Sequence, residues 1–155
     1  MSTQSQAADD LESAARDLDA FIAGCDDDVW KRTVTNDGRT VAGLAFHAAA
    51  GSDVALGWIC QILSGRPVHE NGDMHDAFNN AEAERSAGRS QAEVRAQLER
   101  STGRVAFFLR SLTDEELDRT AMHGIAGRDV SVGRFIANFG RHMRGHLESM
   151  RAALP

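Results

Sequence analysis

The chain has 155 residues, of which 42% are hydrophobic and 26% charged, which is enough for one domain with its own core. Its formal net charge of −6 argues against nucleic-acid binding, which needs a concentrated basic surface. The two cysteines, Cys25 and Cys60, form no metal-type or redox-type cluster, so we expect reduced thiols and a cytoplasmic protein.

No membrane-directed segment is evident in the sequence. The N-terminus lacks the basic stretch followed by an apolar stretch that marks a signal peptide. The longest apolar stretch, residues 41–63, carries Ser52, Asp53 and several glycines, which indicates a buried helix and not a transmembrane span. We therefore expect no membrane partner.

The first long helix is predicted over residues 4–23, where apolar residues recur at helical spacing. They are Leu11, Ala14, Leu18, Phe21 and Ile22. Gly24 is a natural stop. A short helical turn at residues 26–31 and a turn at residues 35–40 follow.

The second helix is predicted from Thr40, a suitable N-cap, to Ser64. It is apolar nearly all round, so we expect it to be the most buried helix. His47 lies on one of its faces, whereas Ile59 points elsewhere. We expect the second apolar face to be covered by the connection that follows or by a second subunit.

A long polar connection, residues 65–89, follows the second helix and contains a predicted helical piece over residues 74–87. Its part at residues 73–80 is a candidate cover for the end of the bundle, with Asp76 and Asn79 supplying polar contacts. Helix capping and surface solvation are the alternative interpretation of this segment.

The third helix begins at Ser90, because Ser90 and Glu93 have the spacing of a capping box, and it continues to Leu112. Residues 113–116 have the same spacing and predict one short helical turn.

Residues 118–129 are predicted as a crossing loop, and no part of the chain shows strand alternation or a hairpin signal. The fourth helix is predicted over residues 131–154. Four long helices predict an all-α fold, a four-helix bundle in which residues 1–155 form a single domain.

Three histidines fall on the predicted core faces of these helices. His142 and His146 are four residues apart, so they share a helix face with Cα atoms about 6 Å apart along the axis. His47 could complete a three-nitrogen metal site from a facing helix. Three protein ligands leave a coordination position open, as in catalytic sites. The alternative is a hydrogen-bonded polar layer in the core without metal.

The other histidines, Cys60 and Trp58 are weaker candidates for functional residues. His69, His75 and His123 fall in predicted loops and are interpreted as solvated residues. Cys60 is interpreted as a small core residue, and Trp58 is also assigned to the core. No catalytic side chain beyond the metal ligands can be read from the sequence.

The order of the segments TVAGLAFHAAAG, SLTDEELDR and HMRGHLESMR resembles the DinB/YfiT-like superfamily of metal-dependent proteins, which is related to the thiol-dependent maleylpyruvate isomerases. This resemblance implies a bundle with up-down-down-up connectivity and a long connection between its second and third helices. It implies a metal at one end of the bundle, held by His47, His142 and His146. Three imidazoles suit zinc, nickel, copper or ferrous iron, and zinc or nickel is the expected divalent ion. The resemblance also implies a homodimer.

The resemblance further implies a transferase or isomerase that acts on a small molecule with a low-molecular-weight thiol of the mycothiol, bacillithiol or glutathione type. In the isomerase branch, the ligand set resembles His, Glu and His, with glutamate at the first position of the final pair. In this chain His142 stands at that position. Maleylpyruvate is therefore not the expected substrate. A metal-dependent hydrolase and a non-catalytic metal-binding stress-response bundle are the alternatives.

Overall fold

The computed structural model describes residues 2–152, which are mostly helical. In chain order the elements are α1 (Thr3–Gly24), α2 (Asp27–Lys31), α3 (Val41–Leu63), α4 (Gly72–Ser86), α5 (Gln91–Ser111), α6 (Asp114–Leu117), β1 (Thr120–His123), β2 (Arg128–Ser131), α7 (Val132–Ile136) and α8 (Phe139–Ala152). Within this part of the chain, no helix has the length and apolar character needed to cross a membrane.

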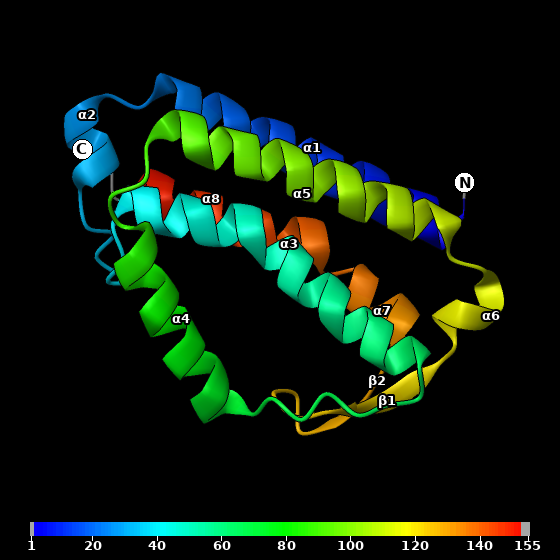
Figure 1. The fold of residues 1–155 in the computed structure, drawn as a ribbon. Coiled ribbons are helices and arrows are strands. Elements are labelled where there is room, and N and C mark those ends of the chain that lie inside the picture. Colours follow the sequence, from blue (N-terminus) through cyan, green and yellow to red (C-terminus); the bar gives the residue numbers. More distant parts are fainter. Residues whose placement is uncertain (1, 153–155) are drawn as a thin grey trace.

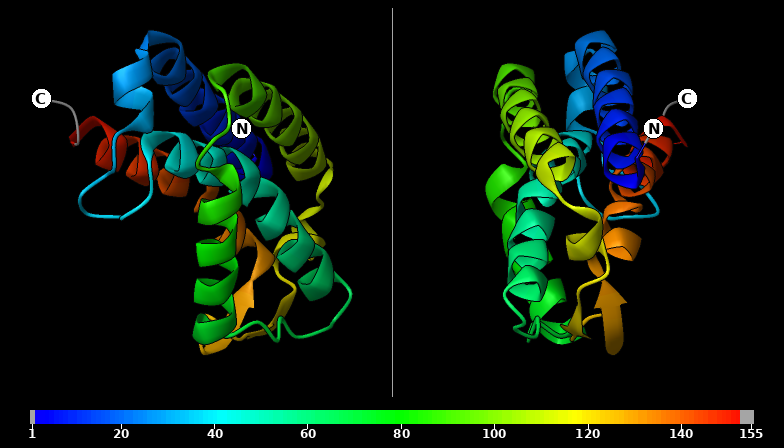
Figure 2. Two further views of the ribbon diagram at one scale, coloured as in Figure 1. Left: turned by 60° about the vertical axis from the view of Figure 1, so that its left-hand side comes forward. Right: turned by 90° about the vertical axis from the view of Figure 1, so that its right-hand side faces the viewer.

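Helices α1, α3, α5 and α8 form a four-helix bundle. Helices α1 and α8 run in one direction and α3 and α5 in the other (Figure 1), which confirms the expected up-down-down-up connectivity. Helix α1 packs against α5 and α8, and α3 packs against the same two helices. The end-on view shows the four helices surrounding a shared interior (Figure 2).

Local sequence signals determine where the bundle helices begin. The Thr40 side chain accepts a hydrogen bond from the backbone N–H of Gly43 at 3.0 Å, so it is the N-cap of α3. Ser90 and Glu93 form the predicted capping box of α5. The core between the helices is aliphatic, and its largest fully buried side chains include Leu11, Leu18, Ile22, Leu44, Ile59, Ile62, Leu109, Met143, Leu147 and Met150.

The predicted fourth helix, residues 131–154, is broken into α7 and α8 (its residues 153 and 154 lie outside the described part). Asn138 lies in the break, and its side-chain amide donates to the carbonyl oxygen of Arg134. Just beyond the break, a Cβ atom on Gly140 would collide with the side chain and carbonyl oxygen of Asp10. The break and the glycine together let α8 approach α1 closely, which helical periodicity alone does not reveal.

The predicted crossing loop contains an antiparallel hairpin, so the expectation that no hairpin exists was wrong. Strand β1 pairs with β2 from Thr120 opposite Ser131 to His123 opposite Arg128. The backbone N–H of Val68 donates to the carbonyl of Met122 at 2.9 Å, which attaches the stretch before α4 to the hairpin. Four-residue strands are too short for alternation to identify them.

Helix α4 packs against α3 at one end and diverges from it toward the other (Figure 1). The connection before α4 and the hairpin join the far ends of the two helices. Ile59, on the second apolar face of α3, is fully buried within the single chain. The homodimer stays a prediction.

Candidate metal centre

Helix α8 holds His142 and His146 one turn apart on the side next to its buried stripe. Their Nε2 atoms are 3.2 Å apart and their ring centroids 4.5 Å apart. His142 is exposed and His146 half-buried, so the two rings flank the apolar stripe and do not lie inside it as expected. Both nitrogens therefore point to one place at the edge of the core.

Helix α3 brings His47 to the same place. His47 is 7% exposed, and its ring centroid lies 5.0 Å from that of His146 and 6.0 Å from that of His142. One ring nitrogen from each of the three histidines lies within 4.8 Å of the other two. A tetrahedral metal with bonds of about 2.0–2.1 Å needs nitrogens roughly 3.4 Å apart, so small side-chain movements suffice.

A carboxylate that sequence reasoning missed orients His47. The Nδ1 atom of His47 donates to Glu82 Oε2 at 2.6 Å, and both side chains are buried. This contact keeps the proton on Nδ1 and leaves the lone pair on Nε2, as in the carboxylate–histidine pairs behind metal ligands. Helix α4 is polar nearly all round, so its sequence gave no indication that this residue faces inward.

The electrostatics of the site keep the histidines of α8 neutral. Burial lowers the pKa of His146 to about 3, and the neighbouring His142, His47 and Arg39 act in the same direction. The pKa of His142 is also lowered, first by desolvation and then by His47 and Arg39. Neutral imidazoles are the form that binds metal, so no proton has to leave these two rings before coordination at pH 7.

The donor set fits a divalent transition metal. Neutral imidazole nitrogens suit zinc, nickel, copper and ferrous iron. The second nitrogen of His47 has a fixed partner, which stabilises the ring in a metal-binding orientation. Three protein nitrogens leave at least one coordination position for a reactant.

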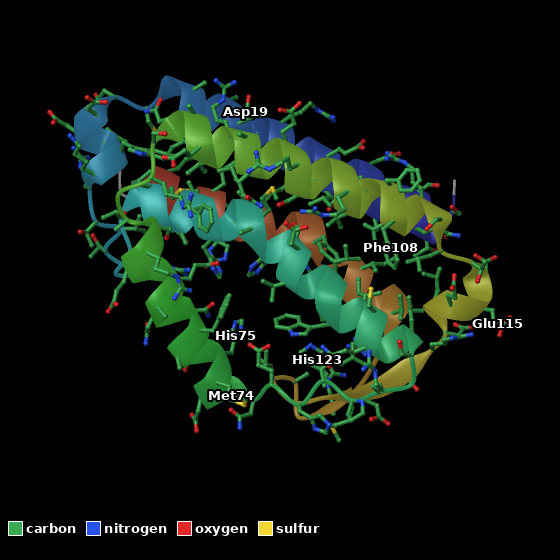
Figure 3. The ribbon with its side chains drawn as sticks, in the orientation of Figure 1. Asp19, Met74, His75, Phe108, Glu115 and His123 are labelled. Carbon is green, nitrogen blue, oxygen red and sulfur yellow. The ribbon has the colours of Figure 1, made fainter. Side chains whose placement is uncertain are left out.

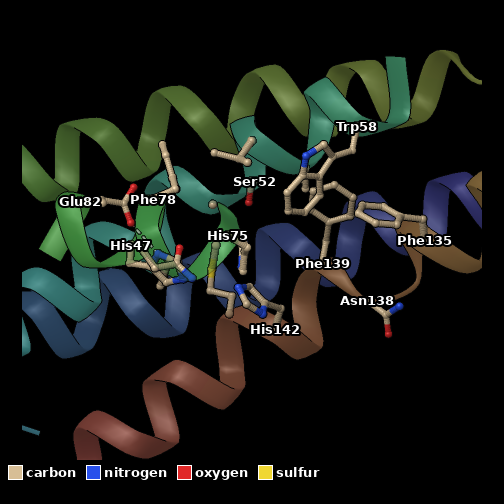
Figure 4. A pocket seen from close by; sticks show the side chains of 16 residues that line it. His47, Ser52, Trp58, His75, Phe78, Glu82, Phe135, Asn138, Phe139 and His142 are labelled. Atoms are coloured by element: carbon tan, nitrogen blue, oxygen red, sulfur yellow. Dashed lines mark hydrogen bonds and ion pairs between the residues drawn. The ribbon is translucent and has the colours of Figure 1, made fainter. Parts of the chain in front are cut away.

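A cavity of about 170 Å³ adjoins the histidines between α3, α4, α7 and α8. His47, Glu82 and His142 lie at one end, and Trp58, Phe135 and Phe139 at the other (Figure 4). The small residues of α3 that line this space include Ala48, Gly51 and Ala55, and a Cβ atom on Gly51 would make an ordinary van der Waals contact with His142 Nε2 at 3.9 Å.

The residues 73–80 form the first part of α4, and this part lines the cavity. Asn79 does so as expected, and its Oδ1 atom is buried without a hydrogen-bond partner among the described residues. Asp76, the other expected contact, is exposed and does not line the cavity. Phe78, which was not expected to contact the site, lines the cavity.

Two of the three histidines assigned to solvated loops are in structured positions, so that expectation was wrong for them. His75 lies on α4, on the side that faces α3 (Figure 3), and its Nδ1 is 3.1 Å from Glu70 Oε1. His123 is 4% exposed and its ring stacks on Phe135, with centroids 5.5 Å apart. Burial lowers the pKa of His123. His69 is exposed, as expected.

Backbone packing fixes the position of Glu70. Glu70 accepts a hydrogen bond from the indole N–H of Trp58 at 3.0 Å. A Cβ atom on Gly124 would collide with the Glu70 carbonyl, so the hairpin can approach this stretch only with glycine there. Trp58, which was assigned to the core, is only partly buried and lines the cavity. Cys60, which was also expected in the core, is exposed.

Comparisons with known proteins agree with this architecture. YfiT from Bacillus subtilis, described as a probable metal-dependent hydrolase with an unusual four-helix bundle topology, superposes with a TM-score of 0.82 at 18% identity, over 97% of this chain and 85% of YfiT. An uncharacterized protein from Clostridium difficile 630 superposes with a TM-score of 0.73 at 14% identity, over 98% and 97% of the two chains. No curated protein matches the sequence. The sequence profile of the DinB superfamily matches residues 10–150, and the chain belongs to that superfamily.

Proposed function

We propose that the protein is a metal-dependent transferase or isomerase that uses a low-molecular-weight thiol, and that His47, His142 and His146 hold the metal. The convergence of three imidazole nitrogens within 4.8 Å supports the metal. Zinc or nickel is the ion we expect, and copper and ferrous iron accept the same nitrogen ligands. A divalent cation held there would favour the thiolate form of a thiol beside it, and the thiolate is the nucleophile.

The surroundings of the histidines support two separate approaches to the site. Exposed His142 borders solvent, which suits a bulky polar thiol. The cavity on the other side suits the electrophilic substrate. In the transfer, the thiolate sulfur forms a bond to the electrophilic carbon, and the leaving group departs with the electron pair of the broken bond.

The carboxylates near the site favour a thiol over water as the nucleophile. Among the described residues that line the cavity, Glu82 is the only carboxylate, and it is bonded to His47. Asp37, whose charge acts on His146, is paired with Arg39. Neither carboxylate is therefore free to take a proton from water. A thiol, with a reference pKa of about 8.5, needs much less assistance to ionise.

Hydrolysis is the second candidate function, because the structurally similar YfiT carries that description. It requires that an ester or amide substrate be cleaved without any thiol. The two functions therefore differ in a simple observable, the dependence of the reaction on added thiol.

The experiment begins with the metal content of tag-free protein purified without chelators. About one zinc or nickel per chain is expected for the intact protein and for H69A, a control at an exposed histidine. H146A should lose the metal. The metal-loaded protein is then assayed with mycothiol, bacillithiol and glutathione and the acceptor monochlorobimane. Absence of metal, or metal without metal-dependent conjugation by any thiol, would contradict the proposal, and thiol-free ester cleavage would favour the hydrolase.

A further inference from the structure

The cavity beside the three histidines has the size of one ring. Its volume is about 170 Å³. An apolar protein cavity of about 150 Å³ accommodates a benzene molecule. The space therefore suits a six-membered ring or a branched alkyl group of similar size.

The far end of this cavity is a rigid aromatic enclosure. Trp58 and Phe135 meet edge to face, with centroids 6.0 Å apart and planes at 90°. Phe135 and Phe139 meet in the same way at 6.1 Å and 77°. Edge-to-face packing of this kind stabilises a fixed arrangement of rings. The cavity is thus preformed, and a ligand entering it does not have to order its walls.

The charged residues that line the cavity disfavour an anionic ligand. The described residues that line the cavity include no lysine or arginine, whereas Glu82 contributes a carboxylate. The buried Oδ1 atom of Asn79 is a further negative end of a dipole. At the aromatic end, away from the metal and from Arg39, a carboxylate or phosphate would lose its hydration without gaining a cation.

We propose that the cavity binds a neutral, apolar, ring-sized group of the electrophilic substrate, with the reacting carbon at the histidine end. This inference rests on the proposed function, because the metal anchors the reacting end. It narrows the substrate class to uncharged aromatic or bulky alkyl electrophiles. The thiol stays outside the cavity, on the side where His142 meets solvent.

Hydroxamates test the inference without catalysis, because their head group binds the metal and only the tail varies. The full chain loaded with Co²⁺ is titrated with acetohydroxamate, benzohydroxamate and 4-carboxybenzohydroxamate, and each Kd is measured calorimetrically. We expect benzohydroxamate to bind about tenfold or more tightly than acetohydroxamate, because one ring leaves water. The carboxylated ring should lose that advantage.

Two variants locate the effect in the cavity. Ala55 lines the cavity, and A55F fills it, so the preference for benzohydroxamate should disappear while Co²⁺ uptake and acetohydroxamate binding stay unchanged. Gly57 is exposed on the same helix with open space around it, so G57F is the matched control and should keep the preference.

The outcomes separate this inference from the proposed function. Co²⁺ uptake with equal affinities for the acetyl and benzoyl compounds would overturn the ring site and leave the metal site standing. A preference that A55F retains would also overturn the ring site. A chain that takes up no Co²⁺ would overturn both. The series measured on the unaltered protein decides the question even if A55F fails to fold.

Discussion

At the residue scale, the contact between Glu82 and His47 is the most specific property of the site. Partners of this kind increase metal affinity by fixing the ring and its proton, and their loss costs about 10- to 100-fold in affinity. We expect E82Q to weaken Zn²⁺ binding by that factor, since it keeps the shape but removes the charge. Competition with a chromophoric chelator measures the change.

The matched control for this substitution lies on the same helix. Glu84 is exposed two residues away, so E84Q should leave Zn²⁺ affinity unchanged. Equal losses in E82Q and E84Q would show that the charge of α4 as a whole, and not the contact with His47, is responsible.

The pKa of His146 predicts how acid affects the metal-free protein. Its pKa is about 3 in the fold, against about 6.5 for an unperturbed histidine, so the unfolded chain binds this proton more readily. The free energy of unfolding should therefore fall as the pH falls from about 6.5 toward about 3. Urea titrations of chelator-treated protein at several pH values measure the slope. H146Q should show a shallower slope, and an unchanged slope would contradict the assignment.

At the element scale, the approach of α8 to α1 depends on Gly140. A methyl group at this position would collide with Asp10, so we expect G140A to destabilise the protein by about 1–3 kcal/mol. Gly145, in the same helix, is exposed with nothing near its Cβ position. G145A should be neutral or stabilising, because alanine is the better helix former. Thermal unfolding of both variants checks the pair, and equal destabilisation would contradict the packing argument.

Elements that depend on local chemistry were predictable from the sequence. The caps at Thr40 and Ser90 were correctly identified because capping involves residues three positions apart. The break between α7 and α8 was not predicted. It allows a contact with α1, which is remote in the sequence. The hairpin was missed because its strands are short and one of them is also attached to the distant residue Val68.

The same distinction applies to the candidate site. Helical spacing predicted that His142 and His146 would meet and that His47 could face them, and the three ring nitrogens do lie together. Their role as metal ligands stays a prediction. Glu82 and His75 were missed because α4 has no apolar stripe from which its inward face could be read. The orientation of that helix is decided by tertiary contacts with α3.

At the scale of the whole molecule, bound metal should stabilise the fold. The metal would join α3 to α8, and an ion that binds only the folded state at about 100 times its Kd contributes about 2.7 kcal/mol. For a chain of this size that corresponds to a rise in Tm of roughly 5–10 °C. Differential scanning fluorimetry with and without Zn²⁺ measures it. H47A should show no rise, and a similar rise in H47A would mean that Zn²⁺ acts elsewhere.

The cavity has two walls of different origin. One belongs to the bundle helices that carry the histidines, and the other comes from α4, which packs chiefly against α3 and contributes few core residues. Changes in α4 should therefore alter the shape of the cavity at little cost to the bundle. Apart from Glu82, which orients His47, the residues of α4 can therefore change which molecules fit the cavity while the three histidines stay the same. Superfamily members that share the three histidines but differ in this segment are expected to perform the same chemistry on different molecules.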